Sequence, residues 1–325
     1  GALDSLSHGV TVFFDHHASM GSERGSLDLV AEAVARAGSR AVLCLETSDR
    51  AGGSAVRRHV EENVSFAAKH RGDPFIGAAF GLHANFTLSE ESLSLIRESR
   101  PEHLPIHIHC GEAPEDLVFC RERGYRGPVD RLRAFGLLDG SSILAHCVHL
   151  DERDYDILEE VRPCIVTNPE SNACNRSGRA SREKLPDHLL GTDGMTGDII
   201  ASLRSYCLLG EGNLEPLARM GRMLFEIPRE RMADYLPIDP FLHVGGAADL
   251  AVPDYVPLSP VSESNLVAHL VFGAKGGKAF LTAVNGRILW HEGHFTDTDI
   301  REVRREARIA AKKLANRYGD WNARA

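Results

Sequence analysis

Imidazole and carboxylate side chains close three short apolar runs of this sequence, and such groups can hold a metal ion or move a proton. They are His109 and Glu112 in the run 104–112, His146 at the end of 142–146, and Asp193 at the end of 189–193. In a (β/α)8 barrel, residues at the carboxyl ends of different strands converge on one mouth, so these groups could share a cation. The chemistry indicated is hydrolysis by water that a metal ion activates.

Short runs with β character recur at fairly even intervals, and polar stretches of helical period follow them. The predicted strands are 10–15, 40–45, 75–81, 105–109, 142–146, 163–167 and 189–192, and the clearest helices are 27–37 and 56–69. Nearly continuous apolar strands that alternate with helices indicate a parallel sheet buried on both faces. We therefore predict an α/β fold, a (β/α)8 TIM barrel of which seven strands are visible.

The start of the sequence indicates which of the eight barrel strands is not visible. Residues 2–9 have the pattern of the tail of a helix that leads into the strand at Val10, and the chain has neither an initiator Met nor a secretory signal pattern. We expect the first strand, and whatever precedes it, to be absent from this chain. The visible strands are accordingly counted as the second to the eighth.

The pattern changes beyond about residue 236 to Pro, Gly and short β runs. Residues 279–284 and 287–290 flank Asn285-Gly286, which is a favoured hairpin turn, and the last segment has an apolar helical face that includes Val303 and Leu314. We predict a barrel domain over 1–235 and, over 236–325, the C-terminal part of a small composite β domain with a terminal helix. Without partner strands this β domain would have an exposed edge.

Composition excludes several classes of function. The 325 residues are 43% hydrophobic and 26% charged, and no apolar run could span a bilayer. A net charge of -9 without clusters of Lys and Arg argues against a nucleic-acid partner. The seven cysteines form no CxxC pair, a usage that fits a reducing cytoplasm. We expect a cytoplasmic protein with no membrane partner, and a homodimer stays open.

Several fragments, in order along nearly the whole chain, resemble the amidohydrolase superfamily. They are Gly9–Ser19 with its Asp-His-His-Ala-Ser run, Gly81–Ala84, His107–Glu112, Leu144–Leu150, Thr167–Asn172 and Gly191–Gly194. The resemblance is to the aminohydrolase and deaminase branch, which includes guanine, adenosine-analogue and triazine hydrolases, and within it to SsnA-type aminohydrolases. One fragment would be weak, but the ordered set is specific.

The resemblance implies one divalent metal, with zinc as the first expectation and iron or manganese as alternatives. In the family a His-x-His pair on the first strand, a His on the fifth and an Asp on the eighth hold the metal. His109 and Asp193 match the last two, and this sequence lacks the first-strand pair. Glu112 matches the residue that carries a proton to the leaving group, and His146 matches a sixth-strand His that binds the attacking water or the substrate.

Further polar residues near strand ends are candidates for binding substrate. His83 matches a fourth-strand position that touches substrate in relatives, and only one of His16 and His17 can face the mouth, because adjacent side chains on a strand diverge. Asn168 and Asn172 follow the seventh strand in an Asn-Pro turn, and His149 follows His146 by three residues. Each also has a structural interpretation, as a loop or packing residue.

These residues predict a metal-dependent aminohydrolase that hydrolyses a C–N bond of a small nitrogen heterocycle. Asp193 and His146 would activate the water, and Glu112 would shuttle its proton. Hydrolysis of a cyclic amide or of a chloro-heterocycle on the same site is an alternative within enzymes. A catalytically silent fragment is the alternative from another class, because the first-strand ligands are missing.

Overall fold

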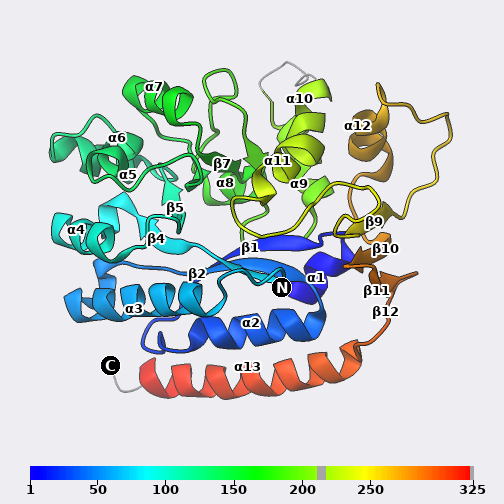
Figure 1. Ribbon diagram of the computed structural model, residues 1–325, viewed down its shortest axis with the longest axis horizontal. Helices are drawn as coiled ribbons and strands as arrows, with labels where there is room; N and C mark the ends of the chain where they lie inside the picture. Colours follow the sequence, from blue (N-terminus) through cyan, green and yellow to red (C-terminus); the bar gives the residue numbers. More distant parts are fainter. Residues whose placement is uncertain (211–216, 323–325) are drawn as a thin grey trace.

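Parallel strands and connecting helices alternate through the first part of the computed structural model, which describes residues 1–210 and 217–322 without the side chains of 318–322 (Figure 1). The strands are β1 (Val12–His17), β2 (Arg40–Leu45), β3 (Ile76–Ala78), β4 (Phe80–Ala84), β5 (Ile106–Cys110), β6 (Ile143–His146), β7 (Cys164–Thr167) and β8 (Leu189–Leu190). The helices are α1 (Ala2–Ser7), α2 (Ser26–Ala37), α3 (Gly53–Lys69), α4 (Glu90–Ser99), α5 (Pro114–Glu122), α6 (Pro128–Ala134), α7 (Glu152–Val161), α8 (Pro169–Asn175) and α9 (Ile199–Leu208), with short 3-10 turns η1 (Asp49–Ala51) and η2 (Asn85–Thr87).

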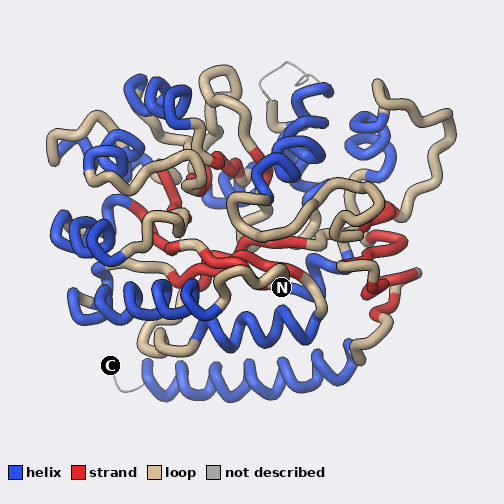
Figure 2. The backbone as a smooth tube through the Cα atoms, in the orientation of Figure 1, coloured by secondary structure: helices blue, strands red, loops and turns tan. Residues whose placement is uncertain are grey.

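The strands pair in sequence order as two parallel sheets, β1-β2-β3 and β4-β5-β6-β7-β8. A parallel bridge between Thr47 and Leu82 joins the sheets, so they form one arc with helices on its outer side (Figure 2). A short helix, α1, does precede the first visible strand, as predicted. The predicted parallel order is confirmed, whereas closure of the arc into a barrel is not part of this topology.

The predicted strand 75–81 is wrong in one respect, because it is two strands. β3 pairs with β2, while β4 pairs with β5, and the chain changes partner at Ala79. Two glycines permit the close approaches on either side: a Cβ on Gly77 would lie 2.6 Å from the Tyr235 carbonyl, and a Cβ on Gly81 would lie 2.3 Å from that of Leu45. Glycine inside a strand commonly marks such a bend.

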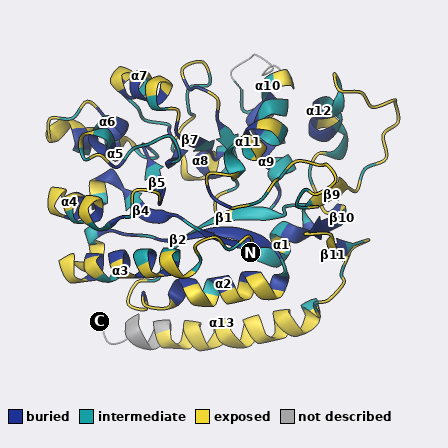
Figure 3. Ribbon diagram, viewed as in Figure 1, coloured by how far each residue is buried: buried dark blue, intermediate teal, exposed yellow. Residues whose placement is uncertain are grey.

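Burial along the strands explains which elements hold the arc together. All six residues of β2 are buried, since this central strand packs on helices and on the interior of the arc (Figure 3). Leu27, Ala31 and Val34 recur at helical spacing on α2 and pack against Leu43 and other residues of β2. Each fully buried Leu or Val contributes roughly 1.5–3 kcal/mol relative to exposure.

The rest of the described chain adds short helices, a second sheet and a long terminal helix. These elements are α10 (Leu217–Gly221), the π-turns η3 (Arg222–Glu226) and η4 (His269–Ala274), α11 (Ile227–Met232), α12 (Leu266–Ala268), β9 (Leu250–Pro253), β10 (Ala279–Val284), β11 (Arg287–His291), β12 (His294–Phe295) and α13 (Ile300–Asn322). The sheet is antiparallel in the order β12-β11-β10-β9, and the predicted Asn285-Gly286 turn joins β10 to β11. The four residues of β9 are exposed. Among the described residues no helix is both long and apolar enough to cross a bilayer.

Candidate active site

The side chains of His109, Glu112, His146 and Asp193 converge at the carboxyl ends of β5, β6 and β8. The rings of His109 and His146 stack with centroids 5.6 Å apart. Nε2 of His146 lies 3.7 Å from Oε2 of Glu112 and 3.9 Å from Oδ2 of Asp193. The predicted convergence is therefore present in the structure, and it places two carboxylates beside one imidazole nitrogen.

Two of these residues have backbone conformations that residues other than glycine rarely adopt. The φ angles of His146 and Asp193 are 74° and 50°. Such left-handed conformations cost about 1–3 kcal/mol and cluster at functional sites. Here the turn of the chain occurs directly at or after a strand end, so it directs both side chains to the mouth of the arc.

A hydrogen bond fixes the orientation of the His109 ring and determines which of its nitrogens keeps a lone pair. Its Nδ1 donates to the carbonyl of His83 at 2.8 Å, and a carbonyl can only accept, so Nε2 of the neutral ring keeps its lone pair. Burial, together with the nearby His146, lowers the pKa of His109, which outweighs the opposite effects of that carbonyl, Glu112 and Asp193. The ring is thus neutral near pH 7, and the lone pair of Nε2 can bind a metal ion.

His146 is held by the amides of α8. Its Nδ1 lies 2.7 Å from Oδ1 of Asn172, and Asn168 Nδ2 lies 3.4 Å from the same nitrogen. In the neutral ring Nδ1 donates its proton to Asn172, so Nε2 is the acceptor nitrogen; it lies beside the two carboxylates and 3.5 Å from Nδ2 of Asn168. Both Asn side chains are buried against His146, and Asn172 lies within α8 instead of in the predicted turn at the rim.

Asp193 is an anchored carboxylate. Ser171 donates to its Oδ2 at 2.6 Å and the backbone N–H of Gly194 donates to its Oδ1 at 2.7 Å. Burial alone raises the pKa of Asp193, but these hydrogen bonds and the two histidines outweigh that effect, and the net pKa lies below its ordinary value. Asp193 is therefore ionised near pH 7.

Glu112 is held more loosely than Asp193. Among the described residues it receives one hydrogen bond, from Nδ2 of Asn175 to its Oε1 at 3.3 Å, where Asp193 receives two shorter ones. The turn before it is rigid, because Gly111 donates its N–H to the buried Asp116 at 2.8 Å. Burial raises the pKa of Asp116 to about 6, although two backbone N–H groups bind its carboxylate and oppose the rise. A fixed backbone with a movable carboxylate suits a residue that carries a proton.

The other predicted histidines, His16, His17 and His149, differ in whether they face the interior of the arc. The ring of His16 turns inward, where Nε2 lies 3.0 Å from the Leu82 carbonyl and the ring contacts His107 and His109 edge to face. His17 lies on the opposite side of the strand, as the alternation of β1 predicts. His149 binds the carbonyl of Ser177 at 2.7 Å. The part that each plays in substrate binding stays a prediction.

His83 lies beside His109 at the mouth, with ring centroids 5.5 Å apart. Its Nδ1 lies 2.9 Å from the hydroxyl of Thr87. Burial first, and then the charges of Arg50 and His109, lower the pKa of His83 to about 4. A neutral imidazole in this position can accept a hydrogen bond from a bound ring or donate one to it.

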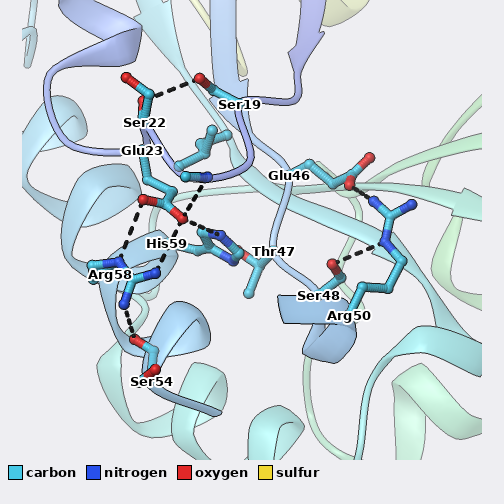
Figure 4. Close-up of polar contacts among 12 residues, drawn as sticks. Ser19, Ser22, Glu23, Glu46, Thr47, Ser48, Arg50, Ser54, Arg58 and His59 are labelled. Atoms are coloured by element: carbon cyan, nitrogen blue, oxygen red, sulfur yellow. Dashed lines mark hydrogen bonds and ion pairs between the residues drawn. The ribbon is translucent and has the colours of Figure 1, made fainter. Parts of the chain in front are cut away.

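The sequence prediction missed Glu46, Arg50 and Ser171. Glu46 comes directly after the apolar strand β2, so the strand-end rule that selected His109 could also have selected it. Arg50 donates to Glu46 from η1 (Figure 4). Ser171 lies in the first turns of α8, and no feature of the sequence marks it as a partner of Asp193.

The donors at this mouth fit part of a metal site. A neutral imidazole Nε2 on His109 and an ionised carboxylate on Asp193 are ligands that zinc accepts. Among the described residues, however, no three His, Cys, Asp or Glu side chains are grouped so that they could hold a metal ion together. The donor chemistry therefore fits a divalent metal, while the number of donors is below the usual three or four.

Deaminases are similar to this chain over almost its whole length. It is 31% identical over 329 residues to a 5-methylthioadenosine/S-adenosylhomocysteine deaminase of Pelotomaculum thermopropionicum, covering 97% of this chain and 74% of that protein. A protein of the same name from Desulfitobacterium hafniense is 30% identical over 338 residues, covering 96% and 73%. A 5'-deoxyadenosine deaminase of Methanosarcina barkeri is 30% identical over 328 residues, covering 97% and 74%. The SsnA-type assignment within the branch stays a prediction.

Solved structures with the same fold include two that contain zinc. An adenosine deaminase from Xanthomonas campestris with bound zinc has a TM-score of 0.81 at 20% identity and covers 97% of this chain and 73% of its own. Atrazine chlorohydrolase TrzN from Arthrobacter aurescens, complexed with zinc, has a TM-score of 0.77 at 19% identity, covering 96% and 74%. At these identities the likeness shows the fold alone, which is TIM-barrel-like.

The family is shown by a match over most of the chain. The sequence model described as amidohydrolase family matches residues 1–235, the part that contains β1 to β8 and the converging site residues. The similar deaminases are at least 30% identical and are covered over more than two thirds of their length. This chain therefore belongs to the amidohydrolase family.

Proposed function

We propose that the protein is a metal-dependent aminohydrolase that removes an amino group from a small nitrogen heterocycle. The observation that carries the proposal is the convergence of His109, His146, Asp193 and Glu112 at the carboxyl ends of three strands. The relatives with the highest identity above are named as deaminases of adenosine derivatives. Membership of the amidohydrolase family supports hydrolysis as the reaction class.

The proposal includes a closed barrel. Among the described residues β1 and β8 each have one neighbouring strand, and a cavity of 860 Å³ is lined by both of them and by inward residues of β5, β6 and β7. A further parallel strand between β1 and β8 would complete the (β/α)8 arrangement and could add metal ligands at the same mouth. Residues 1–235 would then form the barrel domain, and 236–325 would belong to a composite β domain.

His109, through Nε2, and Asp193 would hold the metal in this proposal. A divalent metal, with zinc favoured by its presence in two similar folds, would supply a Lewis acid that lowers the pKa of a water molecule. His146 would orient a water molecule through Nε2, because Asn172 keeps Nδ1 as the protonated nitrogen. Glu112 would take the proton that this water loses and deliver the same proton to the ring nitrogen or to the departing amine.

Product analysis tests the reaction class. The chain, loaded with zinc, iron or manganese, is incubated with a panel of amino-, chloro- and cyclic-amide heterocycles. Release of ammonia with replacement of an amino group by oxygen is expected. Release of halide or a new carboxylate would move the assignment to dehalogenation or ring opening. Absence of turnover with every compound and metal would favour the catalytically silent interpretation of this chain.

A further inference from the structure

Two charged side chains that the proposed mechanism does not use, Glu46 and Arg50, lie just beyond the carboxyl end of β2. Val42 and Cys44 belong to the cluster inside the arc, and Cys44 Sγ lies 3.7 Å from Nδ1 of His107. Because side chains two apart on an extended chain share a face, Glu46 faces the same interior at its mouth. Its side chain is only 10% exposed.

Backbone hydrogen bonds place this pair between two of the candidate binding histidines. The N–H of Glu46 donates to the carbonyl of His17 at 2.7 Å, and the N–H of His83 donates to the carbonyl of Thr47 at 3.0 Å. Arg50 reaches back from η1 to Glu46, and its Nε donates to the hydroxyl of Ser48 at 3.2 Å (Figure 4). The charge of Arg50 also contributes, after burial, to the lowered pKa of His83.

The pair has unused hydrogen-bonding capacity. Arg50 uses Nε and Nη2 for Ser48 and Glu46, and Glu46 accepts through Oε1. Within the described part of the chain, Nη1 of Arg50 and Oε2 of Glu46 make no hydrogen bond. An adjacent free donor and free acceptor on an ion pair match a ligand edge that has an acceptor beside a donor.

We propose that Glu46 and Arg50 determine substrate specificity by binding the lactam edge of an oxo-heterocycle, that is, a ring carbonyl next to a ring N–H. Arg50 donates to the carbonyl oxygen and Glu46 accepts from the N–H. The proposal rests on the proposed function, since it names the substrate class of the same site. A ring without this edge leaves both groups unpaired, and a site built for such hydrogen bonds rejects analogues that lack them.

Guanine and 2-aminopurine are the matched probes, because both have the 2-amino group and only guanine has the lactam edge. Binding of 2-aminopurine to the full chain is followed by its fluorescence, and guanine is measured by competition. We expect guanine to bind roughly 10- to 100-fold more tightly, the usual discrimination of a bidentate contact to a base edge. Arg50→Met and Glu46→Gln should bring this ratio close to one while leaving 2-aminopurine binding within about threefold of the wild type, because the shared ring contacts stay.

Arg133→Met is the matched control. Arg133 forms an ion pair with Glu160 between outer helices, and its side chain is 37% exposed, against 38% for Arg50. This variant should keep the wild-type ratio. If Arg50→Met does not fold, Arg50→Lys and Glu46→Gln still test the pair, because neither preserves both of the paired hydrogen bonds.

A wild-type ratio near one, no binding of guanine, or equal weakening of both probes in the variants would overturn the lactam proposal. Ammonia release is assayed separately. Preference for guanine, with ammonia released from no heterocycle of the panel, would contradict the proposed function and leave the binding role intact. Ammonia from both probes, with equal binding of guanine and 2-aminopurine, would contradict the lactam proposal and leave the proposed function intact.

Discussion

The two carboxylates beside His146 differ in how firmly the protein holds them. Asp193 receives hydrogen bonds from Ser171 and Gly194, whereas Glu112 receives one longer bond from Asn175 among the described residues. A ligand needs a fixed oxygen, and a proton carrier needs an oxygen that can move between two positions. These different environments support the proposal that Asp193 binds the metal and that Glu112 carries the proton.

Substitution of each carboxylate by its amide should separate these roles. Glu112→Gln should retain metal and lose turnover by roughly 10²- to 10⁴-fold, as expected for a lost general acid-base group. Asp193→Asn should lose both metal and turnover. Metal analysis beside steady-state assays measures the difference, with Asp156→Asn on the outer face of α7 as control, where the side chain is 71% exposed. Full activity in Glu112→Gln, or tight metal in Asp193→Asn, would overturn the assignment.

At the scale of elements, one buried carboxylate fastens the loop after β1 to α3. Glu23 accepts from the guanidinium of Arg58 at 3.2 Å and from the N–H of Gly21 at 3.1 Å, and Nε2 of His59 lies 3.8 Å away (Figure 4). The hydrogen bond from Arg58 is the main cause that lowers the pKa of Glu23 to about 2. The same loop follows His17, the last residue of β1, so this contact also restrains that end of the strand.

The contribution of Glu23 to stability should depend on pH. Its folded pKa lies below its unfolded value, so the stabilisation is complete above about pH 4.5 and is lost as pH falls toward about 2. Glu23→Gln should therefore lower the free energy of unfolding at pH 7 and differ less from the wild type at pH 4. Urea unfolding of both proteins at the two pH values measures this. A difference that does not change with pH would contradict the ionic role.

The sequence predicted the elements better than their boundaries. Apolar runs such as β2 and the helical spacing of Leu27, Ala31 and Val34 identified strands and helices correctly, because burial determines both patterns. The change of partner at Ala79 could not be predicted, since it depends on how closely Gly77 and Gly81 approach residues that are distant in the sequence.

The candidate site was predictable only where a residue follows an apolar run directly. That rule selected His109, His146 and Asp193, and the structure brings them together. Asn172 was selected as a rim residue, but it binds His146 from within a helix, because the helix begins immediately after Asn168. Contacts of this kind depend on the path of the chain after the strand, and the strand pattern does not encode that path.

At the scale of the molecule, α13 contributes least to the packed structure. Every described residue from 301 to 317 is exposed, including Val303 and Leu314 (Figure 3). The helix is also strongly basic, since residues 300–317 contain seven Arg or Lys and two Glu in a chain of net charge -9. Its removal should therefore cost little burial of apolar surface.

Truncation after Asp299 should leave the melting temperature within about 2 °C of the full chain, because a change of 1 kcal/mol shifts larger domains by roughly 2–4 °C. Differential scanning calorimetry of both chains measures this. Truncation after Gly293 is the control, since it also removes Phe295, whose ring packs 4.8 Å from that of Trp290, and it should lower the melting temperature further. A fall of more than about 5 °C on the first truncation would show that α13 does pack on the rest of the protein.

The unequal number of neighbours along the strand arc has a consequence for hydrogen exchange. β5 and β6 have a hydrogen-bonded strand on each side, whereas β1 and the two-residue β8 have one. Amide protons around His109 and His146 should be protected for long times, while those around Leu190 and the residues before Asp193 should exchange early, through local opening. We therefore expect one half of the site to belong to the most persistent part of the molecule. We expect the half that contains Asp193 to open first, and a bound ion would leave from that side.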